Sequence, residues 1–137
     1  MKRLIFYENG ICNIRLSGFP EPGEIEEIIE EYVTSVELLP YSLRVIFIDI
    51  SGLVHMGARS RQVFSELLIQ SSRHYGGNIE LVIAGGSMNL RRFIHLFCKG
   101  IGFKERSHVF ADLDEAQSWI ETSSGQKRSL NTTVSLT

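Results

Sequence analysis

Cysteine is scarce in this sequence, with Cys12 and Cys98 the two among 137 residues. Two cysteines without a recognisable ligand spacing give neither a disulfide framework nor a metal-binding pattern. Long apolar runs are missing as well, and none approaches the roughly 20 residues that a helix needs to span a bilayer. The apolar stretch near the amino terminus is too short for a signal peptide. We therefore expect a cytoplasmic protein with no membrane span and no bound metal.

The basic excess that is typical of nucleic-acid binders is also absent, because the formal net charge is −2. No nucleic-acid partner is therefore expected. The residue patterns of serine hydrolases, phosphate-binding loops and dinucleotide-binding folds do not occur. We accordingly predict no catalytic residues, no cofactor and no enzymatic activity, and an enzyme of unrecognised type is the weakest alternative. His55, His74 and His108 are expected to lack assembled partners.

Apolar periodicity predicts a single α/β domain over residues 1–122. Asn9-Gly10 between two apolar runs predicts a hairpin, and alternating strands and helices follow it. The expected fold is a five-stranded, mostly parallel mixed sheet, opened by an amino-terminal hairpin, with about four helices. The strands are expected at 4–7, 10–18, 42–50, 79–85 and 106–111, and the helices at 25–39, 58–74, 87–100 and 112–120. Residues 123–137 are predicted to form a polar carboxyl-terminal tail that need not pack.

Several residues have predicted structural roles within this fold. Pro40 and Gly76-Gly77 are expected to end the first two helices. Phe64, Phe93 and Phe97 are predicted to share one core between helices and sheet, with Cys98 as a small buried apolar side chain. Asp49 is predicted to accept backbone N–H bonds at its strand end, and Asp112 to be the N-cap of the last helix.

Two loops follow the carboxyl ends of neighbouring parallel strands, where such sheets bind ligands. Helix starts offer free N–H groups and partial positive charge, and guanidinium groups bind phosphate or carboxylate. One alternative is therefore a small anionic or lipid-like ligand held in a crevice that Arg59 and either Arg91 or Arg92 approach from opposite sides. The other is that Gly85 and Gly86 serve a turn, Ser87 caps a helix and the arginines point to water. The candidate partner-binding or ligand-binding residues are Ser51, Gly52, His55, Gly57, Arg59, Ser60, Arg61, Gly86, Ser87, Asn89, Arg91 and Arg92.

The segments "VIFIDISGL", "LVIAGGSMNLRRFIHLFCKGIGF" and "HVFADLDEAQSWI" together resemble a known family. In order and spacing they are similar to the STAS domain, the anti-sigma-factor-antagonist fold, and especially to its SpoIIAA-like members. The motifs that carry the resemblance are Asp49-Ile50-Ser51-Gly52, Gly85-Gly86-Ser87, Gly102-Phe103 and the run Val109–Ala116, within a match over about residues 4–121.

The resemblance implies a non-enzymatic regulatory or protein-interaction domain that binds a protein partner through the face around Gly52–Arg61. Antagonists of that family carry a phosphorylated serine at the loop-to-helix junction. Here Gly57, Ala58 and Arg59 fall at that junction, and Ser60 comes one residue late. We therefore predict that the phosphoserine switch is missing.

Surface chemistry separates the remaining alternatives. An exposed apolar patch around Leu53, Val54 and Met56 would favour a protein partner, whereas a basic pocket beside Ser87 would favour a small ligand. Residues 8–49 have a charge balance of −7 and residues 59–106 one of +5. The ridge formed by Arg91, His95 and Lys99 could meet an acidic partner, including the Glu-rich first helix of a second copy in a homodimer, or it is a solvated face.

Overall fold

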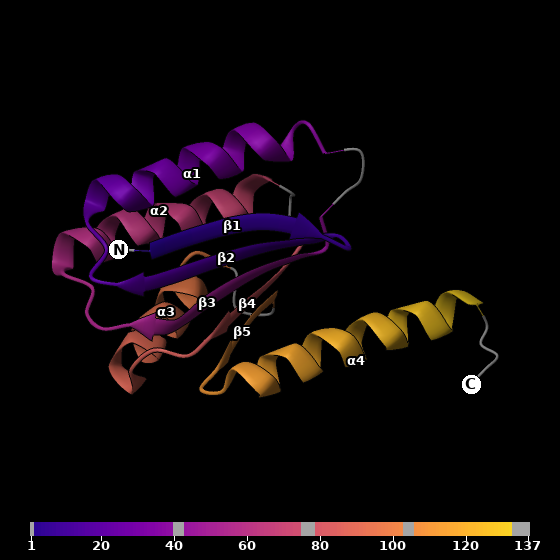
Figure 1. The fold of residues 1–137 in the computed structure, drawn as a ribbon. Helices are drawn as coiled ribbons and strands as arrows, with labels where there is room; N and C mark the ends of the chain where they lie inside the picture. Colours follow the sequence, from indigo (N-terminus) through magenta and orange to yellow (C-terminus); the bar gives the residue numbers. More distant parts are fainter. Residues whose placement is uncertain (1, 40–42, 75–78, 103–105, 133–137) are drawn as a thin grey trace.

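The computed structural model describes residues 2–39, 43–74, 79–102 and 106–132. Strands and helices follow one another in the predicted order (Figure 1). The elements are β1 (Lys2–Glu8), β2 (Ile11–Gly18), α1 (Pro22–Val36), β3 (Val45–Leu53), α2 (Ala58–His74), β4 (Glu80–Ala84), α3 (Met88–Gly100), β5 (Ser107–Phe110) and α4 (Leu113–Thr132). The predicted helix ends at Pro40 and Gly76-Gly77, the motif residue Phe103 and the segment 133–137 lie outside the described residues.

The five strands form one mixed sheet in the order β1-β2-β3-β4-β5. β1 and β2 pair antiparallel, and the remaining neighbours pair parallel. The hairpin turn has Asn9 at φ 53° and Gly10 at φ 78°, the left-handed conformation that Asn-Gly turns adopt. The predicted α/β fold class is therefore confirmed, including its amino-terminal hairpin.

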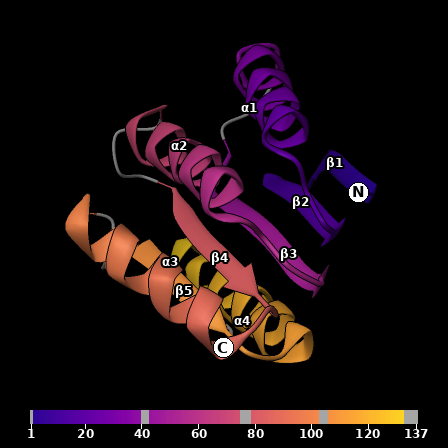
Figure 2. The same cartoon turned by 90° about the vertical axis from the view of Figure 1, so that its left-hand side faces the viewer.

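Helices cover the two faces of the sheet unequally. α1, α2 and α3 lie on one face, and α4 lies on the other, over β4 and β5 (Figures 1 and 2). Alternate residues of β3 divide between the faces: Ile46, Ile48 and Ile50 join the large core under α1–α3. Val45 and Phe47 join the smaller cluster under α4. The larger core is thus the one built by the three βα units.

The predicted aromatic core is confirmed. Phe64 is fully buried, and Phe93 and Phe97 are partly buried against the same cluster. The rings of Phe93 and Phe97 lie 6.1 Å apart between centroids. Cys98 is fully buried, as expected for a small apolar side chain.

The start of α4 is capped as predicted, because Asp112 Oδ1 accepts a hydrogen bond from Asp114 N at 2.9 Å. The backbone of α4 continues to Thr132, so the helix is longer than the expected 112–120. The division into a domain and a tail beginning at Ser123 stays a prediction. Across the described ranges, no helix combines the length and the apolar character needed to cross a membrane.

Candidate functional site

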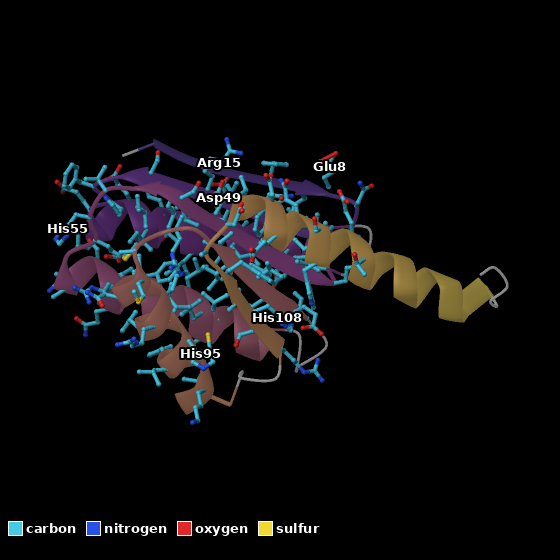
Figure 3. The ribbon with its side chains drawn as sticks, turned by 90° about the horizontal axis from the view of Figure 1, so that it is seen from below. Glu8, Arg15, Asp49, His55, His95 and His108 are labelled. Atoms are coloured by element: carbon cyan, nitrogen blue, oxygen red, sulfur yellow. The ribbon has the colours of Figure 1, made fainter. Side chains whose placement is uncertain are left out.

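A buried carboxylate lies midway along β3. Asp49, 6% exposed, accepts hydrogen bonds through Oδ1 from Ser51 N at 2.9 Å and from Ser51 Oγ at 2.6 Å. Its Oδ2 lies 3.3 Å from Arg15 Nε on the neighbouring strand β2 (Figure 3). The prediction that Asp49 accepts a backbone N–H bond is therefore confirmed, but the bonded residue Ser51 lies within β3, which runs to Leu53 rather than ending at residue 50, so no bond to the loop is involved.

Glycine is required where the strand ends pass close to each other. A Cβ on Gly85, which has φ +92°, would lie 2.4 Å from Ser51 Cα. A Cβ on Gly52 would lie 2.9 Å from Ser17 Cβ, and one on Gly86 would meet Ile50 at 2.8 Å. These glycines let the ends of β2, β3 and β4 approach, which brings the β3–α2 loop beside the start of α3.

Large apolar side chains are exposed where β2 and β3 end and α3 begins. Phe19 is 61% exposed, Val54 69% and Met88 63%. The ring of His55 lies 6.4 Å from that of Phe19 between centroids. We call Phe19, Val54, His55 and Met88 the carboxyl-end patch. Of the apolar residues expected in such a patch, Val54 is exposed, Leu53 is half-buried, and Met56 is instead buried.

A shallow pocket of about 240 Å³ adjoins the carboxyl-end patch. Arg61 lies in it with its Nε donating to Met56 O at 3.3 Å and its guanidinium 5.9 Å from the Phe93 ring centroid. That position combines a hydrogen bond with a cation–π contact and holds the side chain in place. The lining residues are Leu53, Val54, His55, Met56, Arg61, Gly86, Ser87, Asn89 and Leu90.

The structure therefore brings together five of the candidate residues, which are His55, Arg61, Gly86, Ser87 and Asn89. Ser87 also caps α3, since its Oγ accepts a hydrogen bond from Leu90 N at 3.1 Å. Arg59 is exposed on the first turn of α2, and Arg61 takes the position in the pocket that we expected of Arg59.

The other candidate residues have separate positions. Arg91 Nη1 donates to Gly86 O at 2.5 Å and to Gly85 O at 3.4 Å, so it holds its own turn. Arg92 is exposed on α3. Gly57 O accepts the bond from Arg61 N at 2.9 Å that opens α2. The residues that line the pocket therefore do not include Arg59, Arg91 or Arg92, and the expected pair of facing arginines does not form it.

Ser60 points inward. It is 4% exposed, and its Oγ donates to Pro20 O at 2.8 Å. This bond ties the first turn of α2 to the loop that precedes α1. Ser60 therefore has a structural partner and is not on the exposed surface of the β3–α2 loop.

The expectation that His108 lacks an assembled partner is wrong. Its Nε2 lies 2.8 Å from Glu80 Oε2, and its ring stacks on Trp119 of α4 at 4.1 Å between centroids. His55, His95 and His108 lie in different parts of the molecule (Figure 3). Within the part of the chain that the structure describes, no group of three potential metal ligands is assembled.

The two thiols are poor nucleophiles in this fold. Burial raises the pKa of Cys98 to about 11 and, more strongly, that of Cys12 to about 12. Because the thiolate is the reactive form, both side chains are chemically inert near neutral pH. The sequence expectation of a structural role for Cys98 agrees with this.

Sequence reasoning missed Phe19, Met88 and the contact between Glu80 and His108. A parallel pairing of β4 with β5 in the observed register, Val82 opposite His108, would have put Glu80 and His108 on one face. No comparable signal marks Phe19, because its exposure depends on how distant segments pack around the end of β2.

Searches of family models and of curated proteins find no match to this chain. Solved structures do share its fold, and two crystal structures are among them. The crystal structure of an anti-sigma factor antagonist from Mycobacterium paratuberculosis matches with a TM-score of 0.60 and 17% identity, over 88% of this chain and 93% of that one. The crystal structure of a sulfate transporter family protein from Wolinella succinogenes matches with a TM-score of 0.54 and 18% identity, over 85% of this chain and 89% of that one. The chain therefore has the STAS fold, as its motifs predicted.

Proposed function

We propose that this protein is a non-enzymatic regulatory domain that binds a protein partner through the carboxyl-end patch. The observation that carries the proposal is the exposure of Phe19, Val54 and Met88, each more than half exposed, on one end of the domain. Large apolar side chains that gather on a surface mark an interaction site more often than isolated ones do. One of the solved structures that share the fold is an anti-sigma factor antagonist, and a protein partner fits that description.

The proposal includes no phosphoserine switch in the β3–α2 loop. Gly57, Ala58 and Arg59 offer no hydroxyl at the junction, and the nearest serine, Ser60, is buried with its Oγ bonded to Pro20 O. A kinase would have to unfold the first turn of α2 to reach that hydroxyl. Phosphopeptide mapping should find residues 51–60 unmodified in cells, and substantial modification of Ser60 would contradict this part of the proposal.

A small anionic ligand in the pocket is the second candidate function. It is favoured by Arg61, whose guanidinium lines the pocket beside the capped start of α3. A thermal shift in phosphate against chloride at matched ionic strength tests it. If the pocket binds an anion, phosphate should stabilise the wild type and not Arg61→Ala. Arg59→Ala is the matched control, because Arg59 does not line the pocket, and it should respond like the wild type. Equal thermal shifts in all three proteins would contradict a specific anion site and leave protein binding as the remaining candidate function.

Affinity purification from the organism that encodes the chain tests the leading function. The informative variant is Phe19→Ser combined with Val54→Ser. The matched control is Leu38→Ser, because Leu38 is 80% exposed and follows α1, outside the carboxyl-end patch. We expect one protein to be enriched by the wild type and by the control and to be lost with the double variant. Equal enrichment by all three would contradict the proposal.

A further inference from the structure

Opposite charges lie on the two outer helices of the layer that covers the main core. α2 lies between α1 and α3 in this layer (Figure 2). Exposed positions on α1 and at its end carry Glu26, Glu30 and Glu37. Exposed positions on α3 carry Arg92 and Lys99.

The acidic face of α1 is unfavourable for the helix that bears it. Glu26 and Glu30 are four residues apart, the spacing at which like charges repel along a helix. Glu37 is the C-cap, where a carboxylate meets the negative end of the helix dipole, and the last turn has no basic residue. A partner that brings positive charge to this face would relieve these repulsions.

The outer face of α3 forms a stripe of complementary chemistry. Arg92, His95, Leu96 and Lys99 are all exposed and recur at three and four residues, so they share one side of the helix. Leu96 is 57% exposed within this stripe. Arg91, which the sequence pattern placed on the same ridge, is instead engaged with Gly86 O. Arg92 therefore takes its place among the available cations.

We propose that the α3 stripe of one copy binds the acidic face of α1 of a second copy. The two faces cannot meet within one chain, because α2 separates them (Figure 2). They can meet head to tail between copies, which makes the contact heterologous. Leu96, 57% exposed within the α3 stripe, provides an apolar contribution.

A second copy is favoured over an unrelated acidic partner because both complementary faces belong to this chain. Contacts of this type rely on solvent-exposed charges, so their strength falls as salt screens them. Self-association should therefore be strongest at low ionic strength. It does not involve Phe19 or Val54, and a copy joined in this way can still offer those residues to a partner.

Charge reversal tests the proposal by sedimentation velocity at low ionic strength. One variant makes the α3 stripe acidic, Arg92→Glu with Lys99→Glu, and the other makes α1 basic, Glu26→Lys with Glu30→Lys. Each variant alone should lose self-association by about tenfold or more, since like charges then face each other. A mixture of the two should recover it, because each then presents a face complementary to the other.

The control variant is Glu8→Lys with Glu121→Lys, which changes the net charge as the α1 variant does but at exposed positions on β1 and α4. It should associate like the wild type. A monomeric wild type at low ionic strength would overturn the proposal. So would association that survives in either variant alone, or a mixture that associates no better than its components. Circular dichroism of each variant confirms that a loss of association is not a loss of fold.

Discussion

Phe64 and Phe19 are the same type of residue in two regions that differ in burial. Phe64 on α2 is fully buried in the core between the helices and the sheet, whereas Phe19, after β2, is 61% exposed. The core takes its stability from the first kind of position and gains little from the second. The difference teaches that stability depends on the buried ring and little on the exposed one, so a change in the carboxyl-end patch, the proposed binding surface, should leave the free energy of unfolding nearly unchanged.

The largest loss of stability is expected when a core aromatic side chain is removed. Phe64→Ala should reduce the free energy of unfolding by about 3–5 kcal/mol, because it removes a fully buried ring and leaves a cavity. Urea titration followed by circular dichroism measures this. A loss below about 1 kcal/mol would show that Phe64 does not anchor the core as described.

A smaller loss is expected at the buried hydroxyl that ties α2 to the loop before α1. Ser60→Ala removes the donor to Pro20 O and leaves that carbonyl without its side-chain partner. The expected cost is about 1–3 kcal/mol. Ser87→Ala is a useful comparison, because it removes an exposed N-cap at a cost of about 1 kcal/mol. Neutral behaviour of Ser60→Ala in urea titration would mean that the bond contributes nothing.

The interior should also be sensitive to alkaline pH. The pKa values of Cys12 and Cys98 are raised by burial, to about 12 and about 11, so both thiols keep their protons in the native state when the unfolded chain has lost them. Stability is therefore fully present below about pH 8 and falls as pH rises toward 11–12. Between pH 8 and pH 9 the two thiols should contribute a loss of about 1 kcal/mol.

A comparison with Cys98→Ala isolates this effect. The variant should show a shallower decline of stability between pH 8 and pH 9 than the wild type, because one ionisable thiol is gone from the unfolded state. Identical declines in the two proteins would show that Cys98 does not titrate differently on unfolding.

The smallest effect on stability is expected in the carboxyl-end patch. Phe19→Ser should change the free energy of unfolding by no more than about 0.5 kcal/mol, as surface substitutions usually do. Leu38→Ser, at an even more exposed side chain, should behave in the same way. A loss above about 2 kcal/mol for Phe19→Ser in the same urea titration would place Phe19 in the core and remove the contrast with Phe64.

Local sequence signals predicted most of the fold and several anchor points of the site. Asn9-Gly10 predicted the hairpin because both residues accept a left-handed backbone. The short polar side chain of Asp49 predicted that its carboxylate accepts a nearby backbone N–H bond. The N-caps Ser87 and Asp112 were predictable because a hydroxyl or carboxylate just before a helix accepts an N–H bond from its first turn. Each of these roles depends on residues within three positions in the chain.

Longer-range features could not be predicted from one sequence. Arg59 and Arg61 are two residues apart on α2, about 200° around the helix, so the exact phase of the helix decides which one faces the pocket. The exposure of Phe19 and the contact of His108 with Glu80 depend on how segments far apart in the chain pack. The length of α4 was underestimated because the polar composition after residue 122 gives no apolar period to follow.

Site-specific photo-cross-linking in living cells tests the proposed function most directly. A benzophenone amino acid is placed at position 54 in the carboxyl-end patch, or at position 38 as an equally exposed control, where the native residues are 69% and 80% exposed. We predict a discrete cross-linked protein from position 54, abolished by Phe19→Ser, and none of the same mass from position 38. Cross-links that are identical from both positions, or absent from position 54, would contradict a partner-binding role for the patch.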